Sequence, residues 1–250
     1  SNENFIAGVG AAVGLNEQLD EPNALQPGVL RIQNCRFDNN VAVSTGGVFS
    51  IVDGVPQSVI IENSVFDANI SDTAPSSIYS WNSSSQGSSS VDSRLENVQV
   101  LNGVSTSFFL TALAHTTIVQ SRTDGTPATP DLIIRDYRAE GNSADSSAAG
   151  LDVRILANNA LLMDRLTIRN NSGEIHPAIF ARAFQLELRN SLIADNRSMQ
   201  RAVSTFLRAK EGHLVGNTFL RNGSTNDVSN VAEPADTLFL ESWDSIGSQF

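Results

Sequence analysis

A seven-residue motif recurs along this chain and limits the folds that it can adopt. Its first two copies are NCRFDNN at residues 34–40 and NSVFDAN at residues 63–69. With the first residue as position zero, every copy has an apolar residue at position −2 and Asn or Gly at +6. The copies begin at Asn34, Asn63, Asn97, Asp136, Arg165, Asn190 and Asn217, in steps of 29, 34, 39, 29, 25 and 27 residues. Such uneven steps predict coils that share strands and differ in their loops.

Each motif lies between two short runs of residues. Over four to eight positions these runs either alternate between apolar and polar residues or are wholly apolar, as β-strands are. The runs before it are residues 29–33, 59–62, 93–96, 132–135, 161–164, 186–189 and 213–216. The runs after it are residues 46–52, 76–81, 107–113, 149–156, 177–183, 203–209 and 236–243. No stretch shows a sustained helical period, so the chain is predicted to be all-β.

Three short strands per coil predict a chain that winds around its own core. Each strand then pairs in parallel with the equivalent strand one coil earlier, about 4.8 Å away. We therefore expect one all-β domain over residues 1–250, a single-stranded parallel β-helix solenoid of about seven to eight coils. Residues 1–28 form an incomplete first coil, in which residues 4–14 are the last strand. Residues 29–243 hold the seven repeats and residues 244–250 a tail, and the whole is expected to be a piece of a longer chain.

Stacked coils place equivalent residues in columns. Position +3 is an inward apolar column of Phe37, Phe66, Val100, Ala139, Ile168, Ile193 and Leu220. Position +6 is predicted to be a turn ladder of Asn40, Asn69, Gly103, Asn142, Asn171, Asn196 and Gly223. Asn and Gly tolerate a positive φ, and stacked Asn amides can hydrogen-bond to one another. The motif is therefore interpreted as one corner of each coil.

This repeat resembles the right-handed parallel β-helix of the pectin-lyase-like superfamily over residues 29–243. The stretch FDNN (37–40), followed by GGV (46–48), is similar to the F-x-x-N and G-G-apolar pair of polymorphic outer-membrane and autotransporter-type surface proteins. The right hand of the helix is implied by the resemblance alone.

The charge and composition exclude several classes of partner. A formal net charge of −11 argues against nucleic acid, which needs a positive face. No run of about 18 apolar residues is present, so membrane insertion is not expected. The single Cys35 allows no internal disulfide, the three histidines lack metal-ligand spacing, and we expect no metal and no cofactor. A chain rich in Ser, Asn and Thr with one lysine favours an extracellular or cell-surface location.

A candidate ligand site follows from aligning residues 149–156, 177–183 and 203–209. The alignment places Arg154, Arg182 and Arg208 in one outward column, with Asp152 beside them. Stacked guanidinium groups repel one another and attract anions, which are either the local carboxylates of Asp152, Glu211 and Glu241 or an acidic ligand. Polyuronate-cleaving β-helix enzymes carry basic residues on such a face, so the resemblance implies an acidic polysaccharide.

Other outward positions favour structural roles. Position −1 is expected to be a charged ladder of Gln33, Glu62, Glu96, Arg135, Asp164, Arg189 and Gly216, and His213 is expected to point inward. Glycosylation sequons occur at Asn69, Asn82, Asn170, Asn196 and Asn222. Asn82, in a Ser-rich loop, is the best glycan candidate, because Asn69 and Asn196 belong to the turn ladder.

Three functions are compatible with these patterns. No catalytic constellation is apparent, which favours a structural or adhesive module that presents rigid faces to a glycan or a surface protein. A polysaccharide lyase or glycoside hydrolase would place its site on the arginine face, in a cleft walled by residues 115–131. A polymerising subunit would self-associate through the ends of the solenoid.

Overall fold

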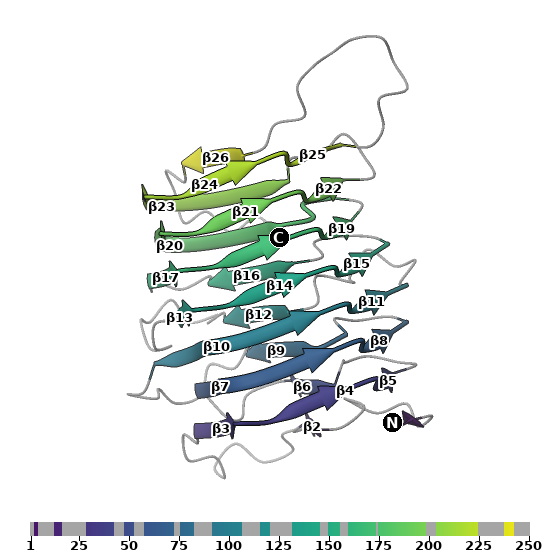
Figure 1. Cartoon of the computed structure of the whole chain (residues 1–250). Helices are drawn as coiled ribbons and strands as arrows, with labels where there is room; N and C mark the ends of the chain where they lie inside the picture. The colour runs from purple at the N-terminus through teal and green to yellow at the C-terminus, as the bar shows by residue number, and fades with distance from the viewer. Residues whose placement is uncertain are drawn as a thin grey trace.

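The structure is a computed structural model. It describes residues 3–4, 13–16, 29–42, 48–52, 58–72, 76–82, 92–106, 116–120, 132–145, 150–155, 160–173, 175–198, 204–224 and 238–242. These residues form a parallel β-solenoid and contain no helix (Figure 1). The prediction of an all-β parallel solenoid is thereby confirmed.

The chain is organised in four parallel ladders that run along the solenoid, so a coil can contribute four strand segments and not the three that were predicted. The first ladder consists of β3 (Val29–Gln33), β7 (Ser58–Asp67), β10 (Ser93–Leu101), β13 (Leu132–Arg135), β17 (Ala160–Asp164), β20 (Ile179–Arg189) and β23 (Thr205–Val215). The second consists of β4 (Arg36–Asp38), β14 (Arg138–Glu140), β18 (Thr167–Arg169), β21 (Leu192–Ala194) and β24 (Thr218–Leu220), with the ends of β7 and β10. Successive strands pair in parallel throughout both ladders.

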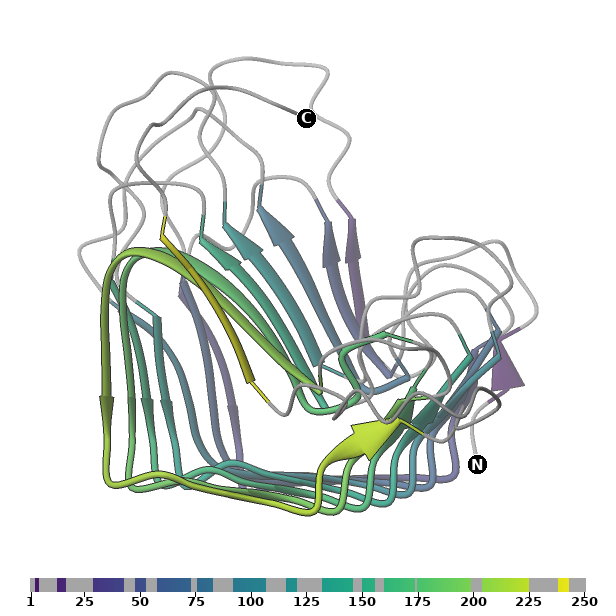
Figure 2. The ribbon, with the colours of Figure 1, turned by 90° about the horizontal axis from the view of Figure 1, so that it is seen from above.

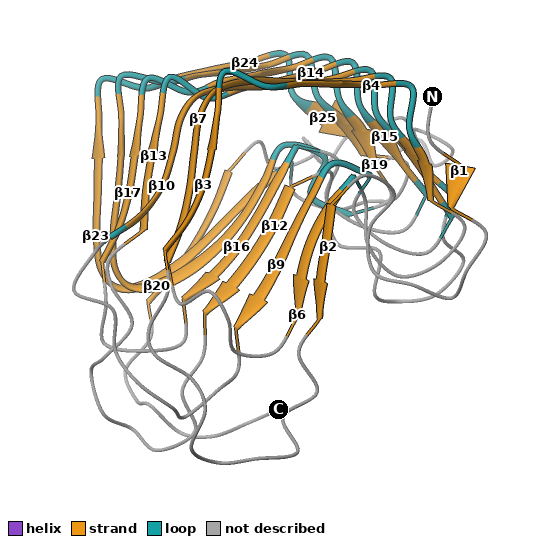
Figure 3. Cartoon of the chain, turned by 90° about the horizontal axis from the view of Figure 1, so that it is seen from below, coloured by secondary structure: helices purple, strands orange, loops and turns teal. Residues whose placement is uncertain are grey.

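The third ladder is a sheet of short strands. It contains β1 (Glu3–Asn4), β5 (Val41–Ala42), β8 (Ile70–Ser71), β11 (Val104–Ser105), β15 (Ser143–Ala144), β19 (Ser172–Gly173), β22 (Arg197–Ser198) and β25 (Gly223–Ser224). The fourth, here called the return ladder, contains β2 (Val13–Asn16), β6 (Phe49–Val52), β9 (Ile78–Asn82), β12 (Thr116–Gln120), β16 (Leu151–Ile155) and β26 (Leu238–Ser242), with the beginnings of β20 and β23. The strands of every ladder stack along one common axis (Figures 2 and 3).

Two predicted strands of the return ladder differ from the structure. The predicted run at residues 107–113 lies outside the described residues, whereas β12 pairs with β9 and β16. This strand falls inside the stretch at residues 115–131 that was predicted to be a loop, so residues 116–120 are not a loop that walls a cleft. The prediction favoured the more apolar run over the alternating, β-branched TTIVQ. At the N-terminal end, β2 pairs with β6 at residues 13–16 and overlaps only the end of the predicted strand.

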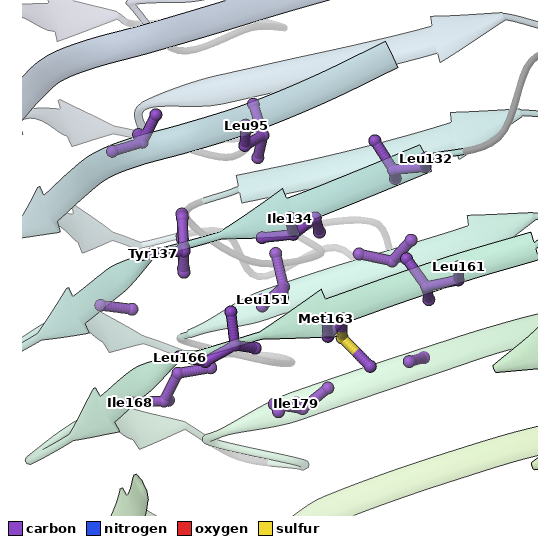
Figure 4. Packing of buried hydrophobic residues seen from close by; sticks show 14 of the residues in the cluster. Leu95, Leu132, Ile134, Tyr137, Leu151, Leu161, Met163, Leu166, Ile168 and Ile179 are labelled. Carbon is purple, nitrogen blue, oxygen red and sulfur yellow. The ribbon is translucent and has the colours of Figure 1, made fainter. Parts of the chain in front are cut away.

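The core lies between the ladders (Figure 4). Its inward column at position +3 contains Phe66, Val100, Ala139, Ile168 and Ile193, each fully buried. Phe37 stacks on Phe66 with 5.0 Å between ring centroids. The column shows how each coil buries its apolar residues against the coil before it.

The last copy of the motif is displaced by one residue from its predicted frame. Ile193 pairs with Phe219, which packs on the core, while the predicted Leu220 is 43% exposed. The residue at position zero is therefore Gly216, whose φ is +66°. Asn217 was predicted as the first residue of this copy because most other copies begin with Asn. The same displacement makes Asn222, rather than Gly223, the last member of the turn ladder.

The corner backbone differs from the prediction in where φ is positive. The positive angles fall at positions zero and +5, for example at Asn63 and Ala68, and not at the Asn of position +6. The corner at position +5 is built by Asn39, Ala68, Asn102, Gly141, Asn170, Asp195 and Arg221. Asparagine recurs at position +6 for another reason, which is the hydrogen bonding of its side-chain amide.

The turn ladder is a buried chain of amides. Asn142 donates to Asn171 Oδ1 from its backbone nitrogen, at 3.0 Å, and from its Nδ2, at 2.9 Å. Asn171 makes the same two bonds to Asn196, and Asn196 to Asn222. Asn40 and Asn69 are joined in this way too, and Gly103 donates its backbone N–H to Asn142 Oδ1. Each side chain therefore satisfies a buried N–H of the preceding coil.

Candidate functional site

The return ladder brings the three predicted arginines into one column. Arg154 of β16 pairs with Arg182 of β20, and Arg182 pairs with Arg208 of β23. The next residue in the column is Glu241 of β26. Because side chains alternate along a strand, these residues point away from the core residues Val153 and Ala181. We call this column, together with the outward side chains beside it on the return-ladder parts of β16, β20 and β23, the arginine face.

Asp152 lies on the same side of β16 as Arg154 and is fully buried there. Its two oxygens accept hydrogen bonds from Arg154, at 3.1 Å from Nε and 3.0 Å from Nη2. Burial raises the pKa of the Asp152 carboxyl, although the charge of Arg154 opposes that shift. Asp152 therefore orients Arg154 and, at 0% exposure, is closed to a ligand.

The other charged residues of the column are Arg182, Arg208 and Glu241, which are two guanidinium groups and one carboxylate. Arg208 Nε lies 3.5 Å from Glu241 Oε2, at one end of the column. Burial lowers the pKa of Arg182, and the charges of Arg208 and Arg154 lower it further. Glu211, a predicted partner of these arginines, accepts a hydrogen bond from Gln185 Nε2 at 3.0 Å. Among the described residues, this column and the adjacent Asp152 hold three guanidinium groups and two carboxylates, a formal charge of +1 on an acidic protein.

Aromatic side chains form the second part of the arginine face. Phe180 and Phe206 stack with 5.1 Å between ring centroids and 10° between ring planes. His176 contacts both rings, at centroid distances of 5.3 and 5.2 Å. The Arg154 guanidinium lies over the Phe180 ring, 4.9 Å from its centroid. The face is thus an aromatic surface bordered by guanidinium groups.

These rings were not predicted, although the sequence carries a signal for them. Phe180 precedes Arg182 by two residues, and Phe206 precedes Arg208 by two residues. Residues two apart in a strand lie on the same side of the sheet. The F-x-R pattern in two successive coils therefore places a ring beside each guanidinium.

The chemistry of this face is suited to binding. Guanidinium groups bind carboxylates through two parallel hydrogen bonds, and aromatic rings provide a flat apolar surface. Asp152 cannot act as a general base toward a ligand, because it is buried and bonded to Arg154. Among the residues that the structure describes, no group of three or more His, Cys, Asp or Glu side chains could hold a metal ion.

Two shallow depressions lie at the corners, away from the arginine face. One of about 580 Å³ is lined by Glu62, Asn63, Glu96, Asn97 and Asp136. Another of about 300 Å³ is lined by Asn170, Asn171, Ser172, Asp195 and Arg197. Both follow the positive-φ corners at which the coils turn.

The outward column at position −1 carries hydrogen bonds and ion pairs between coils. Gln33 donates to Glu62, and Arg189 Nε lies 3.2 Å from Asp164 Oδ1. Burial would raise the pKa of Asp164, but hydrogen bonds from Asn190 and Arg189, with the charge of Arg165, lower it overall. In the last coil the column continues at Val215, not at the predicted Gly216.

His213 and Asn82 are the remaining two residues for which the sequence predicted a role. His213 pairs with Glu187 and is exposed, so the expectation that it points inward is wrong. The one-residue error in the last motif caused this, because a shift of one reverses the face of every side chain in a strand. Asn82 ends β9, and its side chain lies outside the described residues.

The corner ion pairs predict a loss of stability in acid. Hydrogen bonds from Arg165 and Arg221 lower the pKa of Asp136 and Asp195, respectively, below the ordinary value. A lowered folded pKa stabilises the fold above the unfolded pKa of about 3.9, and this stability disappears as the pH falls through the folded value. The stability measured by urea unfolding should therefore decline between about pH 6 and pH 2, with a small contribution from each of these exposed pairs. Asp195→Asn should reduce the slope, and an unchanged slope would contradict this role of Asp195.

Comparisons with known proteins add no relative. No protein-family model, no curated protein and no solved structure matches the chain. In the part of the chain that the structure describes, no helix is long and apolar enough to cross a membrane.

Proposed function

We propose that this chain is a structural or adhesive β-solenoid module that binds an acidic glycan on its arginine face. The observation that carries the proposal is the register of β16, β20 and β23, which places Arg154, Arg182 and Arg208 beside the stacked Phe180 and Phe206. Sugar rings present apolar faces to aromatic side chains, and their carboxylates pair with guanidinium groups. The rings and the arginines therefore fit the same ligand.

The proposal extends to the architecture and the location of the protein. We take each corner motif as one coil, which makes seven coils and an incomplete one before them. Successive pairing from β3 to β23, and of β2 with β6, supports this count. A right-handed, pectin-lyase-like β-helix that works outside the cell or at its surface agrees with the repeat and with the single lysine. Its partner is then a glycan or a surface protein.

A binding experiment with polygalacturonate tests the proposed site. The wild-type chain should bind this polyuronate and should not bind a neutral polysaccharide of similar length. Arg182→Gln should weaken binding about tenfold or more, because a charge-assisted hydrogen bond contributes about 1.5–3 kcal/mol. Calorimetric titration measures both affinities. Arg31→Gln is the matched control, since Arg31 is exposed on the first ladder and should leave the affinity unchanged.

Two outcomes would reject this function. Binding that Arg182→Gln and Arg31→Gln weaken equally would indicate general charge attraction rather than a site. Release of unsaturated sugars or of new reducing ends would indicate an enzyme.

Sedimentation of the same samples without glycan tests self-association through the ends of the solenoid, where Leu240 is 58% and Val215 57% exposed. Oligomers that persist in high salt, together with no glycan binding, would replace the proposal with a polymerising subunit.

A further inference from the structure

The turn ladder and the glycosylation sequons of this chain overlap. Asn69, Asn196 and Asn222 are ladder residues, and each is followed two positions later by a serine. That serine belongs to the third ladder, where Ser71, Ser105 and Ser198 are buried in register with Ala144 and Gly173. The fold itself therefore produces the N-x-S pattern, by requiring an amide at one position and a small residue two positions later.

Asn196 has no hydrogen available for a sugar. Its Nδ2 donates to Ile168 O at 2.9 Å and to Asn222 Oδ1 at 2.9 Å, which uses both hydrogens of the amide. The side chain is 0% exposed. An N-linked glycan would replace one of these hydrogens with a carbon and would require space in a closed corner. Glycosylation of Asn196 is thus incompatible with this fold.

The other two ladder sequons are closed as well. Asn69 Nδ2 donates to Phe37 O at 3.0 Å, and Asn222 Nδ2 donates to Ile193 O at 2.7 Å. Their exposed fractions are 0% and 8%. Both side chains also accept two hydrogen bonds from the preceding asparagine of the ladder. Neither amide can turn outward without breaking the contact between two coils.

Asn170 is different although it adjoins the ladder residue Asn171. It lies at a corner with a φ of +55°, and its side chain is exposed. Its backbone N–H donates to Ala194 O, and its side-chain amide takes no part in the turn ladder. The side chain borders the depression of about 300 Å³ that Asp195 and Arg197 also line. A sugar on Asn170 would therefore lie in solvent, beside polar groups that can hydrogen-bond to it.

We propose that Asn170, in the sequon Asn170-Asn171-Ser172, is an N-glycan acceptor site of the folded solenoid, and that Asn69, Asn196 and Asn222 are not. The donor is a lipid-linked oligosaccharide diphosphate of a glycosylating secretory compartment. The Asn170 Nδ2 forms a bond to C1 of the first sugar, the bond from C1 to the diphosphate oxygen breaks, and Nδ2 loses one proton. The proposal does not depend on the function of the arginine face.

Expression of the chain behind a secretory signal in eukaryotic cells tests the site. Mass spectrometry of glycopeptides, from the secreted soluble protein and from the retained fraction, measures the occupancy of each sequon. We expect a glycan on Asn170 and none on the three ladder asparagines of the secreted protein. Ser172→Ala should remove that glycan while secretion continues. Secreted protein with glycan on Asn196, or with Asn170 unmodified, would overturn the proposal.

A second measurement applies if the chain is retained inside the cell. Protein produced in bacteria carries no such glycan, and Asn170→Cys can be coupled there to a maleimide with a long polar chain. In a Cys35→Ser background, coupling should be complete under native conditions and should leave the unfolding midpoint in urea unchanged. Slow coupling, or a fall in the midpoint after coupling, would show that this corner does not accept a bulky group and would also overturn the proposal.

Discussion

Replacing Asn171 with alanine is expected to destabilise the solenoid by about 3–5 kcal/mol, because a buried polar group without a partner costs about 1–3 kcal/mol. The Asn171 side chain accepts two hydrogen bonds from Asn142 and donates to Asn196 Oδ1 and Ala139 O. Asn142 and Asn171 are each 1% exposed, so water cannot replace these bonds without opening the corner. Urea unfolding followed by circular dichroism measures the change.

Two other substitutions distinguish the effect of the ladder hydrogen bonds from the effect of changing any corner residue. Asn170→Gly changes the exposed neighbour and keeps a residue that accepts a positive φ, so its effect should stay within about 1 kcal/mol. Asn222→Ala removes the last amide of the ladder, which has an asparagine on one side only among the described residues. Its cost should lie between the other two. Equal effects of Asn170→Gly and Asn171→Ala would show that the ladder bonds contribute little.

The sequence predicted the fold because its strongest signal is repetition. A coil that stacks on its neighbour must place apolar residues inward at one position, and Phe66, Val100 and Ile168 follow that rule. The Asn column was visible for the same reason, but its cause was misassigned. Positive φ falls at position +5, where even Ala68 and Arg221 adopt it, while position +6 is selected for an amide. Composition alone does not distinguish these two requirements.

The errors arose where local composition competed with register. Gly216 begins the last motif, but Asn217 resembles the other copies more closely, so the predicted frame moved by one residue. In β12 the alternating TTIVQ was passed over for a more apolar neighbour. The pairing of strands between coils determines both the frame of the last motif and the position of β12. A single sequence contains only indirect information about that pairing. The alignment of Arg154, Arg182 and Arg208 was proposed from three β-runs of similar length, and the register of β16, β20 and β23 agrees with it.

The arginine face was only partly visible in the sequence. The arginines were identified as a column, whereas the stacked rings of Phe180 and Phe206 and the ring of His176 were not. Asp152 was expected beside the arginines, either as a ligand contact or as their local partner, and its complete burial and its bonds to Arg154 favour the second role. Burial depends on how neighbouring coils cover a side chain, which no pattern within one coil specifies.

Gly150→Ala is the second substitution for which we expect a large effect, a loss of about 3 kcal/mol, at the upper end of what overpacking usually costs. A Cβ on Gly150 would lie 2.3 Å from Ala178 O and 3.0 Å from Ile168 Cγ2. Ala178 O accepts the backbone N–H of Leu151, so backbone of two adjacent coils meets here with no space between. The buried Tyr137 hydroxyl also donates to Gly150 O at 3.2 Å. Relief of the clash must therefore weaken the contact between coils.

Gly212→Ala is the matched control, because it makes the same chemical change on β23. A Cβ there would have only Ala209 Cβ within contact distance, at 3.8 Å, and the position is exposed. Alanine in a strand is favoured over glycine by about 0.5–1 kcal/mol, so this variant should be slightly more stable than the wild type. The two unfolding midpoints in urea should move in opposite directions. If both variants unfolded at the wild-type midpoint, the approach of Ala178 O to Gly150 would be too loose to explain why a glycine stands there. Opposite shifts would show that the coils meet too closely for a side chain at Gly150, directly before the strand that carries Asp152 and Arg154.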